Sequence, residues 1–382
     1  MFSYIMMKRD NVNASINKTA CIFNYPPHYR ENIFLKMEEN LDCDFYFGDI
    51  EEGNIKKINH QLFSKPVKNL KTKKLFNNFN WISGTTSILF KKYNQYILTA
   101  DPFILSNWFF LMLSLPLKKK VYLWGHGWYG RESKLKKIIK IIFFKLCDGV
   151  FLYGNYAKNL MVLEGIDANK LHVIYNSLNY DLQLDIRKTL STSAVFTDFF
   201  KNDNPVIIFT GRLTKVKNID LLIESHSLLN KKGINLNVFI LGDGPEKPAL
   251  EALAKTNGLE KNYWFFGACY DEYKIGEFYY NAHVCVSPGN VGLTGIHSMT
   301  YGCPVITHNN FTKQMPEFEV IEELKTGSFF KEEDVEDLSN CIQTFIKASL
   351  NKEKIKHNCF KVIDEYYNPN YQIGLLNKVL NN

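Results

Sequence analysis

Runs of apolar residues alternate with amphipathic stretches along most of the chain. In the first half, the strand-like runs are "TACIFNY", "DFYFGD", "QYILTAD", "KVYLWGHG", "GVFLYG" and "LHVIYN"; in the second half, they are "PVIIFTG", "LNVFILG", "NYWFFG", "HVCVSPG" and "PVIT". Stretches with helical spacing, such as "NIDLLIESHSLLNKKG" and "DEYKIGEFYYNA", lie between them. Continuous apolar strands separated by helices predict doubly wound parallel sheets, which is an α/β fold.

The strand series falls into two halves, and 382 residues are too many for one compact core. Residues 181–205 carry Ser/Thr and Asn/Asp clusters without a strand pattern, so we expect the seam there. We place one domain at 1–185 and a second at 186–365, and we expect a helix at about 366–382 to pack back onto the first. Ligands of open parallel sheets bind beyond the carboxyl ends of the strands, so the residues that follow strands are the candidates for binding.

Positive charge is concentrated in the first half. Residues 1–180 have 25 Lys and Arg against 14 Asp and Glu, a net of +11, whereas the remainder has 21 against 25, a net of −4. A basic half indicates an anionic partner or simply a soluble, lysine-rich surface. The chain has no recognised nucleic-acid-binding motif, so we expect no nucleic-acid partner.

The cysteines and the N-terminus suggest a cytoplasmic protein. None of the eight cysteines forms a Cys-x-x-Cys pair, and several lie in apolar runs, as expected of buried thiols in a reducing compartment. The start "MFSYIMMKRD" lacks the features of a signal peptide, and the longest apolar run is too short to span a bilayer. The predicted helix at 133–146 places Lys134, Lys137 and Lys145 beside apolar residues, which suits the anionic inner face of a membrane. A helix packed on the sheet with a lysine-rich outer face explains the pattern equally well.

Three loops that follow strands carry candidate ligand-binding residues. After "PVIIFT", Arg212 offers a planar, forked guanidinium and Lys217 a compact ammonium, and together they suit a diphosphate. A solvated basic loop has the same pattern. After "LNVFIL", Gly242-Asp243-Gly244 forms a tight turn but not a dinucleotide fingerprint, which disfavours an oxidoreductase. After "HVCV", the glycines of "GNVGLTG" allow close backbone approach to a ligand.

The three loops together resemble the donor domain of GT-B glycosyltransferases of family 4. The matching stretches are "GRLTKVKNIDLLI", "LGDGPEKPALEALA", "FFGACYDEYKIGEFYYNAHVCVSP" and "GLTGIHSMTYGCPVI". The resemblance implies two facing Rossmann-like domains with a cleft between them, the first on the acceptor side and the second holding a UDP- or GDP-linked sugar. It also implies a retaining transfer to a glycan or lipid-linked glycan, without a metal or other cofactor. In the family, residues matching Arg212 and Lys217 hold the diphosphate, helped by backbone N–H groups at Gly292 and Leu293.

Two glutamates that the family usually carries around this loop are missing. The alignment places Gly289 where the donor sugar is contacted and His297 where the ribose is contacted. We expect His297 to take over the ribose contact, with Glu317 of "KQMPEFEVI" as the helper and Glu319 as a nearby alternative. The expected donor site comprises Arg212, Lys217, Gly244, Gly289, Asn290, Gly292, Leu293, His297 and Glu317.

Two loops of the first half complete the expected site. In "LWGHGWYGR", the resemblance assigns a catalytic role near the transferred sugar to His126, although a buried structural histidine is the alternative. In "NYPPHYR", we expect His28, Tyr29 and Arg30 on the acceptor side of the cleft. The leading hypothesis is a retaining glycosyltransferase of surface polysaccharide or glycan synthesis. The competing one, suggested by the missing glutamates, is a homologue that binds a nucleotide sugar without transferring it.

Overall fold

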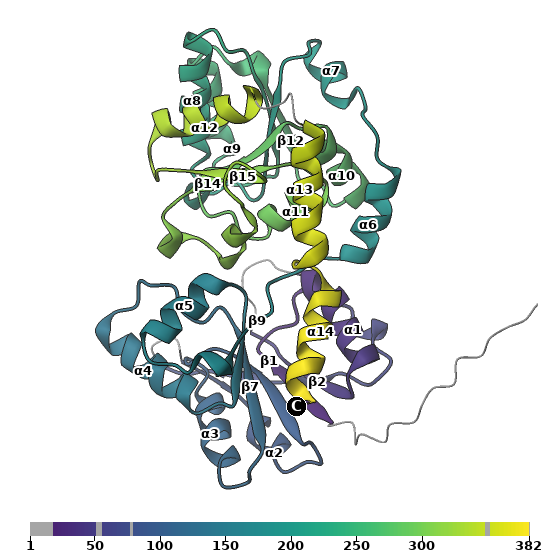
Figure 1. Cartoon of the computed structure of the whole chain (residues 1–382), viewed down its shortest axis with the longest axis vertical. Coiled ribbons are helices and arrows are strands. Elements are labelled where there is room, and N and C mark those ends of the chain that lie inside the picture. Colours follow the sequence, from purple (N-terminus) through teal and green to yellow (C-terminus); the bar gives the residue numbers. More distant parts are fainter. Residues whose placement is uncertain (1–17, 51–55, 77–78, 348–351, 382) are drawn as a thin grey trace, which may run out of the picture.

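The computed structural model describes residues 18–50, 56–76, 79–347 and 352–381, which form two α/β domains (Figure 1). The sheet of the first domain has seven parallel strands in the order β3-β2-β1-β6-β7-β8-β9. These strands are β1 (Thr19–Phe23), β2 (Cys43–Gly48), β3 (Lys68–Leu70), β6 (Gln95–Thr99), β7 (Lys120–Gly125), β8 (Gly149–Leu152) and β9 (Leu171–Val173). A small antiparallel hairpin pairs β4 (Thr72–Lys74) with β5 (Asn80–Ile82). The helices of this part are α1 (Glu31–Asn40), α2 (Thr85–Ile88), α3 (Leu105–Ser114), α4 (Lys134–Lys145) and α5 (Asn155–Leu163).

The sheet of the second domain has six parallel strands in the order β12-β11-β10-β13-β14-β15. They are β10 (Val206–Thr210), β11 (Asn237–Leu241), β12 (Tyr263–Gly267), β13 (Val284–Ser287), β14 (Val305–His308) and β15 (Gly327–Phe330). The helices are α6 (Tyr180–Thr189), α7 (Val195–Phe200), α8 (Ile219–Lys231), α9 (Lys247–Thr256), α10 (Glu272–Asn281), α11 (Thr294–Thr300), α12 (Val335–Lys347) and α13 (Lys352–Glu365). In both sheets the first strand lies inside the sheet and the chain winds outward in both directions, so the doubly wound α/β prediction is confirmed.

Strand β10 shows why the apolar runs fold as they do. Val206 and Ile208 point into one buried cluster, and Ile207 and Phe209 point into another on the opposite face of the sheet. Successive side chains of a strand alternate between faces, so a strand covered on both sides must be apolar at every position. The same requirement explains the continuous apolar runs elsewhere in the sequence.

The segment expected to be an irregular seam is helical. Helix α6 packs against α10 and α11, and α7 packs against α10, so both belong to the second domain. The expected boundary between residues 185 and 186 falls inside α6. Its Ser/Thr cluster lies between the two helices, which explains why the sequence pattern there was not that of a strand.

The last helix, α14 (Pro369–Leu380), returns to the first domain. It lies beside α1, whereas the preceding α13 packs on α11 of the second domain (Figure 1). Ile373, Leu376 and Leu380 of α14 join the buried cluster on one face of the first sheet. The chain therefore passes between the two domains twice, once before and once after the second domain.

All eight cysteines are free thiols, and most are buried. The apolar run between Phe103 and Leu117 contains α3, and no helix of the described residues is long and apolar enough to cross a membrane. The N-terminal residues 1–17 that entered the expectation about a signal peptide lie outside the described part of the chain.

Candidate functional site

A cavity of about 810 Å³ lies between the two domains. Its second-domain wall comes from the loops after β10, β11 and β12 and from the start of α11, and its first-domain wall includes His28 and Tyr29. These loops lie at the carboxyl ends of parallel strands, beside the point where the order of the second sheet reverses. Open α/β sheets bind ligands at this position.

Arg212 is the exposed cation on the second-domain wall of this cavity. It follows β10 by two residues, and Gly211 turns the chain with a φ of 138°. The neighbouring turn is packed so closely that a Cβ on Gly242 would lie 1.9 Å from the Gly211 carbonyl oxygen. Within the described parts of the chain, no carboxylate forms an ion pair with the guanidinium, which leaves it available to an anionic ligand.

Lys217 lies behind this wall and does not line the cavity. Its Nζ donates to the backbone oxygen and to Oδ1 of Asn290, both at 2.8 Å. Burial lowers the pKa of Lys217. The sequence placed Arg212 and Lys217 together on a diphosphate, but in the structure Arg212 faces the cavity while Lys217 holds the loop that carries Asn290.

The "GNVGL" loop is fixed by backbone contacts that leave no room for a side chain at Gly289. The Gly289 N–H donates to the Lys217 carbonyl at 3.0 Å, and a Cβ would lie 2.1 Å from the Val216 carbonyl oxygen. On the other side, Gln314 Oε1 accepts from the Val291 N–H at 2.9 Å. Gln314 thus supports the loop from the segment that follows β14.

Further along the loop, Gly292 has a φ of 51°, and Leu293 lines the cavity. Gly244 does not line it, and a Cβ there would lie 2.3 Å from the Leu213 carbonyl oxygen. Its small size is required for the packing of the two strand-to-helix turns.

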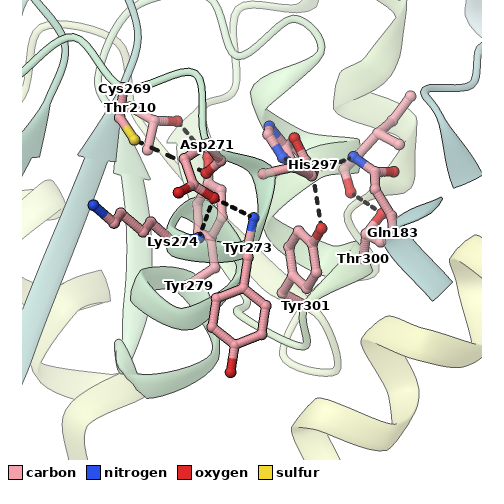
Figure 2. A network of polar contacts seen from close by, with 12 residues as sticks. Gln183, Thr210, Cys269, Asp271, Tyr273, Lys274, Tyr279, His297, Thr300 and Tyr301 are labelled. Atoms are coloured by element: carbon pink, nitrogen blue, oxygen red, sulfur yellow. Dashed lines mark hydrogen bonds and ion pairs between the residues drawn. The ribbon is translucent and has the colours of Figure 1, made fainter. Parts of the chain in front are cut away.

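His297 lines the cavity and belongs to a network centred on Glu272, the first residue of α10. Figure 2 shows His297 with two other members of this network, Gln183 and Tyr301. His297 Nε2 lies 2.8 Å from Glu272 Oε1, and the same oxygen accepts from Tyr301 Oη at 2.8 Å and from Gln183 Nε2 at 2.9 Å. Burial disfavours the charged form, but the imidazole and the three hydrogen bonds outweigh burial and lower the pKa of Glu272. A half-buried, ionised carboxylate is therefore held at the cavity wall by one of its two oxygens.

Glu317 does not line the cavity and is buried at the domain junction. Its Oε1 accepts from Asn176 Nδ2 at 2.9 Å, and its Oε2 has no hydrogen-bond partner among the described residues. Burial raises the pKa of Glu317. Its position makes the expected role as a helper of His297 untenable, since the carboxylate beside His297 is Glu272.

Glu319, the alternative helper, bonds across the two domains. Its Oε2 and Oε1 accept from the backbone N–H groups of Asn155 and Tyr156 at 2.7 and 2.6 Å. These N–H groups lie in the first turn of α5, and the N-cap Gly154 has no side chain that could accept hydrogen bonds from them. A carboxylate of the second domain thus caps a helix of the first.

His126 lines a second cavity of about 570 Å³, which lies in the first domain. Tyr29 borders both cavities, whereas Arg30 lines only this one and His28 only the cavity between the domains. Burial, with smaller contributions from Arg30 and Lys140, lowers the pKa of His126 to about 4. The imidazole is therefore neutral at pH 7.

Sequence reasoning missed Glu272 and its partners Gln183 and Tyr301. Glu272 follows β12 by a few residues, so the rule that picked Arg212 and the "GNVGL" loop also applies to it. Its acidic neighbour Asp271 accepts from the Tyr273 and Lys274 N–H groups as the N-cap of α10. The pair "DE" therefore has the ordinary pattern of a helix start, which hid the second carboxylate.

Comparisons with known proteins find similar sequences and a similar fold. Residues 194–362 match the family model of glycosyl transferases group 1. The chain is 26% identical over 234 residues to an uncharacterised 41.2 kDa protein in the cps region of Klebsiella pneumoniae, which covers 59% of this chain and 55% of the relative. It is 28% identical over 137 residues to the alpha-monoglucosyldiacylglycerol synthase of Acholeplasma laidlawii, which covers 35% and 33%. The aligned parts thus span at most about half of these relatives.

Among solved structures, that of Anabaena Alr3699/HepE in complex with UDP superposes with a TM-score of 0.72 at 15% identity. The superposition covers 95% of this chain and 99% of that one. The chain therefore has the GT-B fold over almost its whole length, and the family match in the second domain supports a glycosyltransferase role.

The closed packing at Gly289 leads to a first prediction. Gly289→Ala should lower the free energy of unfolding by about 1–3 kcal/mol, because the added methyl group must displace the Val216 backbone. The control is Gly374→Ala in α14, where a Cβ meets nothing within 4 Å and alanine favours the helix. Urea denaturation of the two variants measures the difference, and equal stabilities would contradict this account of the loop.

Proposed function

We propose that the protein is a glycosyltransferase that moves a sugar from a nucleotide donor to an acceptor held by the first domain. The observation that supports this most directly is the cavity between two parallel sheets, with the exposed guanidinium of Arg212 on the wall of the matched second domain. A structure of the same fold is described as a complex with UDP. A UDP- or GDP-linked sugar in this cavity would have its diphosphate beside Arg212.

In this proposal, Arg212 supplies the positive charge that the leaving diphosphate needs, and no metal or other cofactor takes part. A guanidinium forms two parallel hydrogen bonds to phosphate oxygens and keeps its charge at all working pH values. Lys217 acts indirectly by fixing Asn290 and thus the "GNVGL" loop. Retention of the anomeric configuration, with membership of family 4, is inferred from the sequence resemblance.

We assign the ribose contact to Glu272 in place of the family's missing carboxylate. Its Oε1 is occupied by three donors, so Oε2 is the atom that can accept from the ribose hydroxyls. His297, which we expected to bind the ribose itself, becomes a positioning residue that orients Glu272. The acidic group for the ribose is thus supplied by α10, in place of the glutamate that the resemblance has at position 297 of α11.

His126 is the proposed catalytic residue on the acceptor side. Because its pKa is about 4, it is neutral at pH 7 and can accept a hydrogen bond from an acceptor hydroxyl. It lines the first-domain cavity, and Tyr29 marks the place where that cavity meets the donor cavity. Arg30 remains an acceptor-side residue in the proposal, whereas His28 lines the first-domain wall of the donor cavity.

The packing at Gly289 also favours the second candidate function, a homologue that binds a nucleotide sugar without transferring it. A family carboxylate that contacts the donor sugar cannot be placed there without moving the backbone of residues 216 and 217. Release of the nucleoside diphosphate from a bound donor, with or without acceptor, separates an enzyme from a binding protein.

We further propose that the protein works in the cytoplasm at the inner face of a membrane, on a glycan or lipid-linked glycan. Leu135, Ile138 and Ile142 form an exposed apolar stripe on α4, with 68%, 56% and 51% of their surfaces exposed. Helix α3 lies beside α4 (Figure 1), and Trp108 of α3 contacts Phe143 of α4. Helix α3 adds the exposed side chains of Phe109, Met112 and Leu113. One relative, 28% identical over 137 residues, is named alpha-monoglucosyldiacylglycerol synthase.

Lys137, one of the lysines that we first associated with this surface, forms an ion pair with Glu164. Lys140 of the same helix pairs with Glu132 at 2.7 Å, so both charges are largely balanced within the protein. Phe144, also on α4, is buried. The exposed apolar stripe is therefore the better target for an experiment than the lysines.

The donor assignment predicts that Arg212→Ala weakens nucleotide binding by about ten-fold or more, since a charge-assisted contact contributes about 1.5–3 kcal/mol. A thermal-shift screen of UDP, GDP, CMP and their sugars identifies the nucleotide, and calorimetry then measures its affinity. Lys215→Ala removes a charge from the same loop outside the cavity and should leave the affinity unchanged. Equal affinities of Arg212→Ala and the wild type would refute the assignment.

The ribose assignment predicts that Glu272→Gln weakens binding of the ribonucleotide about ten-fold and binding of its 2′,3′-dideoxy analogue hardly at all. Glu277→Gln, on the same helix but outside the cavity wall, is the control. Replacement of His297 by Ala should have a smaller effect in the same direction. A loss that is the same for both nucleotides means that Glu272 does not touch the ribose.

The membrane proposal predicts that replacing Leu135, Ile138 and Ile142 by Ser lowers sedimentation with anionic vesicles about ten-fold or more, because burial of such side chains contributes about 1.5–3 kcal/mol each. The control replaces Leu182, Val216 and Leu324, three exposed apolar residues of the second domain, by Ser. The proposal fails if the wild type does not sediment with the vesicles or if both triple variants behave alike.

A further inference from the structure

The cavity of the first domain has a chemistry of its own. It lies at the carboxyl ends of β1, β6, β7 and β8, where Tyr25, Ala100, His126 and Tyr153 follow the strands. Its volume of about 570 Å³ is enough for a ligand the size of a sugar phosphate. It is the natural place for the acceptor, because Tyr29 also borders the donor cavity.

Positive charge prevails in the wall of this cavity. Four cationic side chains, Arg30, Arg131, Lys136 and Lys140, line it together with two carboxylates, Asp101 and Glu132. Glu132 is already engaged, because it accepts from Lys140 Nζ at 2.7 Å and from the N–H groups of Tyr129 and Gly130 at 3.0 and 2.9 Å. No ion pair joins Arg131 or Lys136 to a carboxylate in the described residues.

Two of these four cations lie over one aromatic ring. The Arg131 guanidinium lies 5.0 Å from the centroid of Tyr129, and the Lys140 ammonium lies 5.8 Å from it. The His126 ring lies 5.7 Å from the same centroid, and its buried Nδ1 has no hydrogen-bond partner in the described part of the chain. Cations and an unused imidazole nitrogen gathered in this way form a cradle for an anion.

A phosphoryl group fits these features better than a carboxylate. It carries up to two negative charges and three terminal oxygens, which match a forked guanidinium, a lysine ammonium and an imidazole N–H. A carboxylate carries only one negative charge, so it balances less of the positive charge that lines the cavity. Positive surroundings also help to lower the pKa of His126, through Arg30 and Lys140, in addition to burial.

We propose that the acceptor carries a phosphoryl group, which Arg131 and Lys136 bind in the first-domain cavity beside Tyr129 and His126. The proposal rests on the sugar transfer proposed above and defines the class of its acceptor as a phosphate ester. The ester is either a soluble sugar phosphate or the phosphate head of a lipid whose chain follows the apolar stripe of α4, since Lys136 and Leu135 are neighbours on that helix.

The test measures binding of four probes to the full chain by calorimetry: glucose 1-phosphate, decyl phosphate below its micelle concentration, glucuronate and decyl glucoside. We expect one or both phosphates to bind, and the double variant Arg131→Gln, Lys136→Gln to weaken that binding ten-fold or more. The control double variant Lys118→Gln, Lys120→Gln removes two exposed charges of the same domain away from the cavity. It should bind the phosphates as the wild type does.

A second readout follows the His126 imidazole by NMR. A bound phosphate offsets the charges of Arg30 and Lys140, so it should raise the pKa of His126, and glucose should not. Binding of glucose 1-phosphate alone identifies a soluble ester, and binding of decyl phosphate alone identifies a lipid. The proposal is overturned if glucuronate or decyl glucoside binds as tightly as the phosphates, or if the Arg131 and Lys136 variant binds them normally.

Nucleotide binding in the same samples separates this proposal from the proposed function. If the nucleotide binds with the expected dependence on Arg212 while neither phosphate binds, the acceptor class is wrong and the transferase proposal stands. If no nucleotide binds, the proposed function itself fails.

Discussion

The structure depends on one constraint, which is that a parallel sheet must be covered on both faces. Because parallel strands are connected by helices that cross over the sheet, all the carboxyl ends of the strands lie along one edge. The apolar clusters on the two faces of β10 show this covering directly, since neighbouring residues of the strand enter different clusters. With two such sheets in one chain, polar residues collect at two edges, and the cavity between the domains is where those edges meet.

The relative position of the domains depends on a few polar contacts and on the last helix. Asn176 holds Glu317, and the α5 N-terminus holds Glu319, at the place where the chain enters the second domain. Helix α14 closes the arrangement by burying Leu376 and Leu380 in the first domain. The "GNVGL" loop and the first-domain cavity thus lie in different domains but in a defined relation, as the proposed transfer between two substrates requires.

The fold was largely predictable because its signals are local. Each long apolar strand was visible as a continuous run. In contrast, β3 and β4 were missed because they are short and polar, with residues such as Lys68 and Lys74, and β5 and β15 were missed because they are short. The helices of residues 181–205 were missed because they are too short to show a clear helical period and because their apolar residues contact the second domain. Tertiary contacts, which the sequence pattern does not contain, decided these segments.

The candidate site was predictable only as far as it follows strand ends. Arg212, Leu293 and His297 line the cavity between the domains, as their positions after strands indicated, and His126 lines the neighbouring one. Lys217 and Glu317 do not, because burial beneath the loop and at the domain junction cannot be seen from spacing along the chain. Glu272 was hidden because a carboxylate in the first turn of a helix is ordinary, and only the approach of Gln183 and Tyr301 distinguishes it.

The contact between Glu319 and α5 gives Gly154 an unusual position in the molecule. A Cβ at Gly154 would lie 2.4 Å from Glu319 Oε1, so the residue that precedes the helix also sets how closely the other domain can approach. Separation of the two domains would expose the carboxylate and the N–H groups to water, which can satisfy both, so this contact is reversible. The absence of one methyl group at Gly154 sets how closely the domains approach here, and the contact lies outside both cavities.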